Sequence, residues 1–302
     1  MSKAAVVLII FKRADTTQRV FEAIKAYQPE KLYIVADGPR RNVPGEVDAC
    51  ERTRAVVENI DWACQVIRIY SEENLGSRTR IQTGLDEVFE SSDSAIILED
   101  DCLPDGTFFT YANQMLDLYQ HDRSIGMISG NNFLWPASAS SKGHYLSALP
   151  HIWGWATWKR SWDLYEKNAE SWPTANKNEI LRKAFFYAIY RSAWKETLDN
   201  ISEIDAWDFQ WCYSLWKNDS LSVVPKVNLV HNLGLNEMGT NTLSPKSHFQ
   251  NKLGFYNDPG SLLAKKHKRS RLNDAIELTV FRIFAARHMS LADWIAKLRI
   301  RN

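Results

Sequence analysis

The sequence predicts an α/β fold: a Rossmann-like, mostly parallel sheet with helices on both faces, followed by a Trp-rich region and C-terminal helices. Over the first 130 residues, short apolar runs alternate with amphipathic segments at roughly 30-residue intervals, which is the βαβ pattern of a parallel sheet. After about residue 132 this rhythm stops and tryptophan becomes frequent. We therefore expect subdomains at 1–132 and 133–258 and a basic helical tail at 259–302.

Five apolar runs are expected to be strands. The first, Ala4–Phe11, is continuous and β-branched, as in a strand buried on both faces. Asp15 is expected to cap a helix that ends near Tyr27. The other strands are expected at Leu32–Ala36, Val66–Tyr70, Ala95–Leu98 and Ile125–Ile128, and further helices in the second half of 43–57 and at Arg78–Phe89.

The Trp-rich region, residues 151–216, is predicted to be mostly helical. Trp155, Trp158 and Trp162 follow helical spacing, which is typical of one buried helix face. Val223–Val230 is expected to be a returning strand at the sheet edge, because Pro225 cannot donate a ladder hydrogen bond. Loops are expected at 135–147 and 231–247, and helices at Leu272–Ala286 and Leu291–Leu298.

Composition bounds the class of protein. The chain has 302 residues, of which 45% are hydrophobic and 24% charged, as in ordinary globular proteins. No apolar run is long enough for a membrane span and the N-terminus lacks a signal-peptide cleavage site, so we expect a cytoplasmic protein. The four cysteines are far apart, which disfavours disulfides and structural zinc. Basic charge gathers in residues 262–302 rather than over the body, which argues against a nucleic-acid partner.

Several enzyme classes are excluded by missing motifs. The sequence holds no GxxxxGK[ST], no GxGxxG after the first strand, no HExxH and no GxSxG. P-loop NTPases, standard dinucleotide folds, zincins and α/β-hydrolases are therefore not expected.

The strongest chemical signal is Glu99-Asp100-Asp101, which directly follows the predicted strand Ala95–Leu98. Three adjacent carboxylates repel one another, and a divalent cation removes that conflict. Oxygen ligands suit Mg²⁺ or Mn²⁺, which bind through one or two carboxylates and substrate phosphates. The alternative is a solvated acidic turn.

Two other strand ends carry candidate ligand contacts. Asp37 follows the second strand and either accepts the imide N–H of a uracil ring or caps its own turn. Arg13 follows the first strand and either meets a phosphate or ribose or is a solvated surface charge. In the loop Glu73–Arg78, a helix begins with cations, which favours an anionic ligand there over an ordinary cap.

Together, the segments VVLIIFKR, IVADGP, ENLGSRTR and ILEDDC resemble the nucleotide-sugar domain of GT-A-fold glycosyltransferases, with EDD in place of the usual DxD. The resemblance covers residues 4–135 and extends more loosely through 150–162 and 206–211. It implies that Asp101 binds the metal directly and that Glu99 and Asp100 lie near the ribose and the donor sugar. The residues implied to hold the nucleotide-sugar are Phe11, Arg13, Asp37, Asn74 and Arg78.

Inverting sugar transfer also needs a general base on the face opposite the leaving diphosphate. Asp208 is the best candidate, because its aromatic neighbours are expected to raise its pKa by desolvation. In the family a Trp is followed by two acids, whereas here Phe209 follows Asp208. Asp205 and Glu203 therefore remain alternatives.

Later residues complete the predicted site. Trp153 and Trp155 are expected either to stack on a sugar ring or to belong to the core. Asn131, with Asn132, is expected to bond donor hydroxyls or to serve a tight turn. His231 is expected either to complete the metal shell or to be structural. The loop 232–247 is expected to close over the donor.

These observations predict a metal-dependent inverting glycosyltransferase of polysaccharide biosynthesis, using Mn²⁺ or Mg²⁺ and a nucleotide-diphosphate sugar, with UDP favoured. The acceptor is expected to be a glycan or a lipid-linked glycan, and the basic C-terminal helices either touch a membrane surface or dock on the domain. The alternatives are a metal-dependent nucleotidyltransferase or phosphohydrolase, or a non-catalytic carbohydrate-binding protein.

Overall fold

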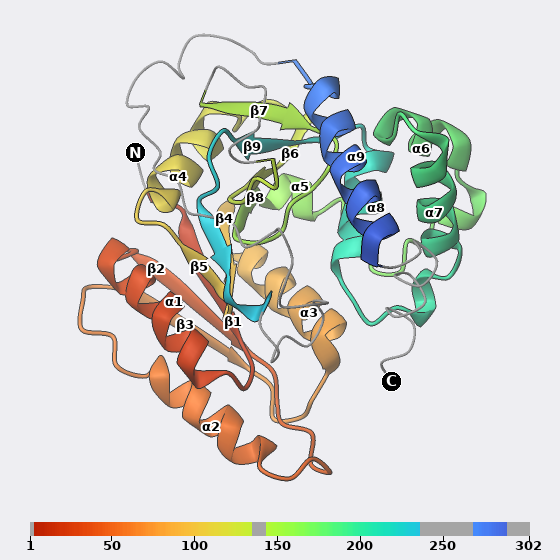
Figure 1. The fold of residues 1–302 in the computed structure, drawn as a ribbon. Helices are drawn as coiled ribbons and strands as arrows, with labels where there is room; N and C mark the ends of the chain where they lie inside the picture. The colour runs from red at the N-terminus through yellow and green to blue at the C-terminus, as the bar shows by residue number, and fades with distance from the viewer. Residues whose placement is uncertain (1–2, 135–142, 236–267, 289–302) are drawn as a thin grey trace.

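A computed structural model describes residues 3–134, 143–235 and 268–288. Its centre is an eight-stranded sheet in the order β3-β2-β1-β4-β8-β6-β9-β7 (Figure 1). Six strands run in one direction, and β7 and β8 run against them. The strands are β1 (Ala5–Ile10), β2 (Lys31–Ala36), β3 (Gln65–Tyr70), β4 (Ser94–Glu99), β6 (Ile125–Ser129), β7 (His144–Ser147), β8 (Trp155–Trp158) and β9 (Leu221–Pro225). The predicted α/β fold class and all five predicted N-terminal strands are confirmed.

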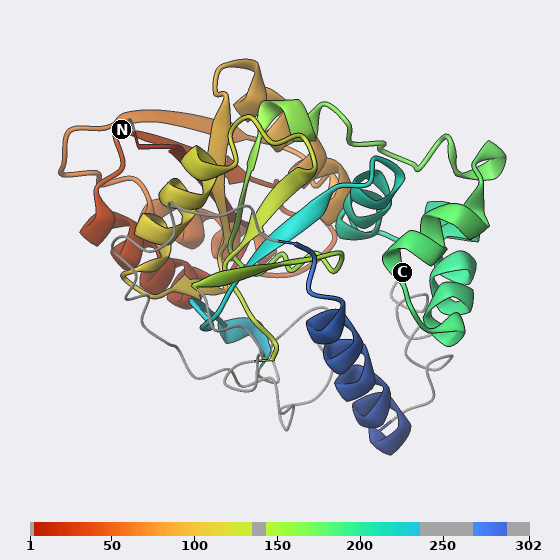
Figure 2. The same ribbon diagram turned by 90° about the horizontal axis from the view of Figure 1, so that it is seen from above.

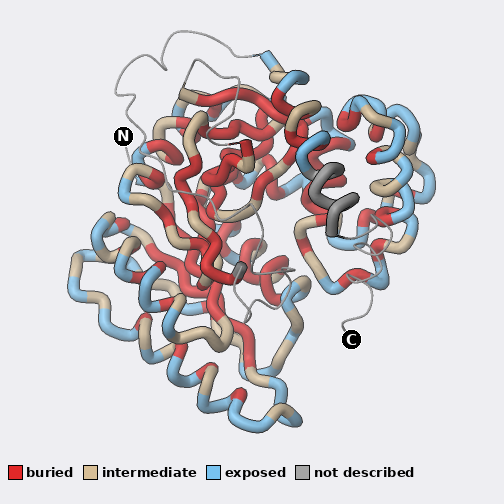
Figure 3. The backbone as a smooth tube through the Cα atoms, viewed as in Figure 1, coloured by how far each residue is buried: buried red, intermediate tan, exposed pale blue. Residues whose placement is uncertain are grey.

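Helices lie on both faces of this sheet because its central strands are apolar on both sides. Val6 and Leu8 of β1 face α1 (Ala14–Tyr27) and α4 (Phe108–Leu118), whereas Val7 faces α3 (Gly76–Glu90) and α8 (Asp208–Lys217). Figure 3 shows the strands buried and much of the outer surface of α1 and α2 exposed. The other helices are α2 (Glu46–Val56), α5 (Lys159–Trp162), α6 (Lys177–Ala184), α7 (Ala188–Asp199) and α9 (Arg271–His288), with 3-10 turns at Trp172–Thr174, Ile201–Glu203 and Leu233–Leu235.

Helices α6 and α7 form a separate cluster with part of α8, at one end of the sheet (Figures 1 and 2). Buried aromatic and aliphatic side chains hold it together, among them Phe185, Trp216 and Leu278 of α9. A small second sheet pairs β5 (Cys102–Pro104) with β10 (Val230–Asn232). This pairing brings a late segment of the chain beside the residues that follow β4.

The prediction of a tryptophan helix was wrong. Trp155 and Trp158 belong to strand β8, in which residues three apart point to opposite faces. Trp155 packs in the cluster with Trp211, whereas Trp158 lies in the core on the α1 side. Helical spacing alone does not separate a helix face from a strand buried on both sides.

Three smaller expectations also need correction. Strand β9 pairs with both β6 and β7, so Pro225 ends an internal strand and β7 is the edge. Residues 144–147, expected in a loop, form β7. Helix α1 begins at Ala14 rather than at a cap by Asp15, and the Thr17 hydroxyl donates to the Arg13 carbonyl at 2.7 Å.

Helix α9 confirms the predicted helix at Leu272–Ala286, whereas Leu291–Leu298 lies outside the described residues. Within the described part of the chain, none of the helices has the length and apolar character needed to cross a bilayer.

Candidate active site

The candidate site lies at the carboxyl ends of the parallel strands β1, β2, β3 and β4. Because these four strands are adjacent and run the same way, the segments that follow them meet at one edge of the sheet. Phe11 and Arg13 follow β1, Asp37 follows β2, Asn74 follows β3 and Asp100 follows β4. The structure therefore brings these predicted residues to one edge.

Arg13 bridges the two aspartates of the acidic triplet. Its Nη1 donates to Asp101 Oδ2 at 2.8 Å and its Nη2 donates to Asp100 Oδ1. The backbone N–H of Phe11 donates to the other Asp100 oxygen at 3.4 Å. Burial disfavours the charged guanidinium, but the charges of Asp100 and Asp101 outweigh it and raise the pKa of Arg13. Burial also raises the pKa of Asp100 to about 6 against the effect of Arg13.

The Glu99 carboxyl group has no hydrogen-bond or ion-pair partner among the described residues, although Glu99 is only partly exposed. Burial, followed by the charges of Asp101 and Asp100, raises the pKa of Glu99 to about 8. One guanidinium thus faces three carboxyl groups. A second cation would relieve this repulsion.

The triplet fits a divalent cation in its chemistry. Carboxylate oxygens are the ligands of Mg²⁺ and Mn²⁺, and Mg²⁺ needs only one or two of them when substrate phosphates supply the rest. Within residues 3–134, 143–235 and 268–288, no group of three or more His, Cys, Asp and Glu side chains is arranged to hold a metal by itself. A metal here would therefore depend on the substrate for the rest of its shell.

Strand β10 presents Asn232, not His231, to the triplet. A Cβ on Gly234 would lie 2.4 Å from Asp101 Oδ2 and 3.1 Å from Asn232 Oδ1. The Asp101 carboxylate and the Asn232 side chain therefore lie close together, next to Gly234. The backbone N–H of Leu233 also donates to the Asp101 carbonyl at 2.7 Å. Neighbouring residues of a strand point to opposite faces. Asn232 is a site residue that sequence reasoning missed.

His231 precedes Asn232 in β10 and therefore points to the opposite face of the small sheet, which favours the structural interpretation of His231. Burial and the charge of Arg19 on α1 lower the pKa of His231, and no carboxylate of the triplet acts on it. A histidine among three carboxyl groups would have its pKa raised. His231 therefore belongs to the α1 side of the small sheet.

Asp37 orders the loop between β3 and α3. Its carboxylate accepts from the backbone N–H groups of Gly38, Leu75 and Gly76 at 2.9–3.1 Å and from the Asn74 side chain at 3.0 Å. A carboxylate has about four acceptor positions, and these bonds use them. The arrangement supports the turn-capping interpretation of Asp37 and makes the uracil contact unfavourable.

The loop 73–78 is also tied to the segment that precedes α8. Gly76 has φ of +78°, and a Cβ there would lie 3.3 Å from the Asp205 carboxylate. Arg78 donates to the Ile204 carbonyl at 3.1 Å. Arg78, which the sequence predicts to contact a phosphate, thus connects the start of α3 to the segment before α8 in this structure.

Asp208 is the first residue of α8 and is partly exposed. Burial raises the pKa of Asp208 to about 6, against the backbone N–H groups at the helix start, which lower it. Its charge in turn raises the pKa of Glu99, so the two carboxyl groups lie within electrostatic reach. The adjacent Trp207 is buried and stacks on Trp155 with ring centroids 5.3 Å apart. The pKa of Asp208 is thus raised, with burial as the cause, and the alternative acids Glu203 and Asp205 are exposed.

Asn131 and Trp153 lie together beyond β6 and before β8. The Asn131 side chain is fully buried, and its Oδ1 accepts from the backbone N–H of Trp153 at 3.2 Å. The Nδ2 of Asn131 has no hydrogen-bond partner among the described residues. Trp153 is the only tryptophan between 153 and 162 that is not buried, and Phe133 packs edge-on against it at 4.9 Å. Asn132 is fully buried, and its side-chain amide donates to the carbonyls of Pro225 and Lys226. These bonds favour the structural, turn-stabilising interpretation of Asn132.

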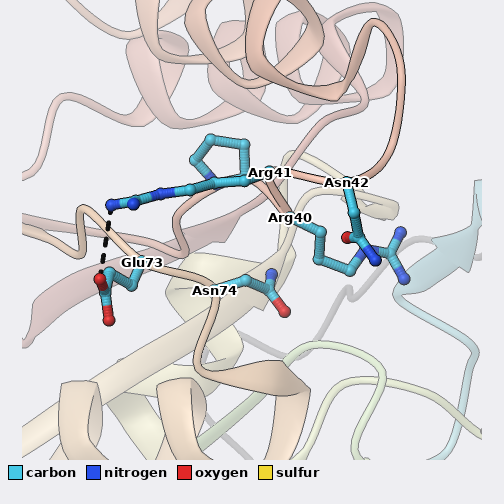
Figure 4. A pocket seen from close by; sticks show the side chains of 6 residues that line it. Arg40, Arg41, Asn42, Glu73 and Asn74 are labelled. Atoms are coloured by element: carbon cyan, nitrogen blue, oxygen red, sulfur yellow. Dashed lines mark hydrogen bonds and ion pairs between the residues drawn. The ribbon is translucent and has the colours of Figure 1, made fainter.

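An open cavity of about 310 Å³ lies beside the loop that Asp37 orders. Its lining residues are Pro39, Arg40, Arg41, Asn42, Glu73 and Asn74. Figure 4 shows Arg41 reaching Glu73, an ion pair of 3.4 Å between the two loops.

Buried Glu46 positions the cationic wall of this cavity. It accepts from Arg40 Nε at 2.8 Å and from Lys12 Nζ at 2.6 Å. Hydrogen bonds from Arg40, opposed by burial, and then from Lys12 hold the pKa of Glu46 near 2. Sequence reasoning missed Arg40 and Glu46, because polar residues in an irregular stretch give no periodic signal.

No family model and no curated protein matches the sequence. Among solved structures, HddC from Yersinia pseudotuberculosis aligns with a TM-score of 0.32 and 10% identity over 52% of this chain and 77% of its own, with the same values for its complex with GMP-PN. The glycosyltransferase GlyE of Streptococcus pneumoniae TIGR4 aligns with a TM-score of 0.36 and 12% identity over 74% of this chain. This chain spans 45% of GlyE. Similarity this low carries no inference about function, which must come from the site.

Proposed function

We propose that this chain is a glycosyltransferase that moves a sugar from a nucleotide-diphosphate donor, a UDP-sugar, to a hydroxyl of a glycan or lipid-linked acceptor with inversion. The observation that supports this most is the acidic triplet at the carboxyl end of β4, where Arg13 spans Asp100 and Asp101 and the Asn232 side chain lies beside Asp101. Glu99 belongs to an acidic triplet suited to a cation. Asp208 begins helix α8 beside the buried Trp207 and is itself partly exposed.

Donor binding is assigned to the triplet and to Arg13. Asp101, with Glu99 and Asn232 beside it, would hold Mn²⁺ or Mg²⁺ together with the donor diphosphate. When bound, the ion neutralises the departing diphosphate. Arg13 already spans Asp100 and Asp101 and has the fork geometry that suits a phosphate. Its guanidinium would contact the diphosphate through the N–H groups that the two carboxylates leave free.

Asp208 is assigned the role of general base. Because its pKa is about 6, its carboxylate is mostly ionised at neutral pH and remains basic enough to accept a proton. The acceptor oxygen forms a bond to the anomeric carbon while the bond from that carbon to the diphosphate oxygen breaks. The acceptor proton passes to Asp208 Oδ, and the nucleoside diphosphate leaves with the electron pair.

The test combines binding and turnover. A thermal-shift panel of nucleotide-sugars, with and without Mn²⁺, should show stabilisation that needs both partners. Asp101→Asn should remove it, and Asp208→Asn should keep donor binding but lower transfer by about 10²-fold or more. Asp205→Asn tests the alternative base: it should transfer normally, and loss of transfer in this variant alone would move the role of base to Asp205.

Product analysis separates the rival functions. Release of nucleoside diphosphate supports sugar transfer, whereas pyrophosphate or inorganic phosphate would indicate a nucleotidyltransferase or phosphohydrolase. Glycan binding that survives EDTA without turnover would indicate a carbohydrate-binding protein. Normal transfer by the Asp208→Asn variant would remove Asp208 from the mechanism.

A further inference from the structure

Exposed apolar side chains gather where α6 turns into α7 and where α9 begins. Phe186, in the α6–α7 turn, is 75% exposed, and Ile189, one helical turn later, is 44% exposed. Leu272, in the first turn of α9, is 62% exposed. Leaving these side chains in water brings no folding benefit, so this patch of Phe186, Ile189 and Leu272 needs another explanation.

Specific bonds bring the two parts of this patch together. Arg269, just before α9, donates through Nη2 to the Ala184 carbonyl at 2.6 Å and through Nη1 to the Lys183 carbonyl. The Tyr190 hydroxyl on α7 donates to the Leu278 carbonyl on α9. Figures 1 and 2 both place α9 next to the α6–α7 pair. The start of α9 and the end of α6 are therefore neighbours.

Unpaired cations flank the patch. Arg182, Lys268 and Arg271 are exposed, and none of them forms an ion pair with any described residue. Lys183 is different, because Glu179 at 3.2 Å and Asp219 at 2.8 Å neutralise it. The side chains near the patch that have no ion-pair partner among the described residues therefore carry positive charge.

The geometry points to an anionic phospholipid surface as the partner of this patch. An exposed aromatic ring in a turn, with exposed aliphatic side chains and with arginine and lysine nearby, matches the layering of a bilayer interface. The Phe186 ring and the branched chains of Ile189 and Leu272 enter the acyl boundary. The cations contact phosphate headgroups, each adding roughly 1 kcal/mol. This inference does not depend on the proposed reaction.

Vesicle sedimentation of the full chain tests this inference. Binding is expected to vesicles that mix phosphatidylcholine with phosphatidylglycerol and to be weak with phosphatidylcholine alone. The triple variant Phe186→Ser, Ile189→Ser, Leu272→Ser should bind at least about tenfold more weakly, because the inserted apolar area is lost. Circular dichroism and the thermal midpoint check that the variant is folded.

Val47→Ser is the matched control, because Val47 on α2 has the same 44% exposure as Ile189. This control should bind vesicles like the parent. The inference is overturned if the parent fails to bind anionic vesicles, if the triple variant binds unchanged, or if the control loses as much binding. A dimer that dissociates only in the triple variant would assign the patch to a second copy of this chain instead.

Discussion

Replacing Arg13 by Gln removes the only cation that contacts the acidic triplet within the described residues. Removing one partner of a fully buried ion pair costs about 3–5 kcal/mol. The side chain of Arg13 is 27% exposed and that of Asp101 13%, so water offsets part of this loss. We therefore expect a loss of about 2 kcal/mol in the free energy of unfolding, or roughly 3 °C in the thermal midpoint.

The pH dependence and the metal response make this prediction specific. With Gln at position 13, ionisation of Glu99 and Asp100 is no longer compensated, so the deficit should grow as pH rises through about 6 and 8. Mg²⁺ or Mn²⁺ should restore stability, because a ligand at 100 times its Kd contributes about 2.7 kcal/mol. The variant should also bind Mn²⁺ more tightly than the parent while binding UDP more weakly.

The assay is urea unfolding at several pH values, with and without Mn²⁺, together with calorimetric titration of the ion. Arg68→Gln is the control, because the Arg68–Glu58 pair of 3.3 Å lies at the surface with the arginine 34% exposed. Its loss should stay below about 1 kcal/mol and should not respond to the metal. Equal losses in the two variants, or no response of Arg13→Gln to Mn²⁺, would refute the reasoning.

Three further predictions concern single carboxyl groups. Asp37→Ala should lower the free energy of unfolding by about 2–4 kcal/mol in urea, because four hydrogen bonds to the Asp37 carboxylate are lost. Unchanged urea unfolding together with weaker UDP binding would instead favour the uracil contact. Transfer should rise with pH and level off above about 6, as Asp208 loses its proton, in a profile of kcat/KM; a flat profile would exclude this base. Glu46, with a depressed pKa, stabilises the fold above its ordinary value of 4.5 and loses that contribution as pH falls toward 2. Glu46→Gln should therefore cost about 3 kcal/mol at pH 7 and less near pH 3, measured by urea unfolding.

Local patterns in the sequence were sufficient to predict the fold class and the edge of the sheet that carries the candidate site. Continuous apolar runs with helical segments between them leave few arrangements besides a parallel sheet covered on both faces. Adjacent parallel strands end at the same edge, so Arg13, Asp37 and the triplet had to converge. The raised pKa of Asp208 agrees in direction with the expectation, and its cause in the structure is burial at the start of α8.

Only the tertiary structure decided which side chain of a strand faces the site and which carboxylate is already satisfied. The pairing of β10 with β5 presents Asn232 to Asp101 and leaves His231 on the other side. The close approach of two loops consumes the acceptors of Asp37. Trp155 and Trp158 have helical spacing in the sequence, but pairing of β8 with β4 and β6 makes them part of a strand. In each case the outcome depends on contacts between residues far apart along the chain, which periodicity in the sequence does not encode.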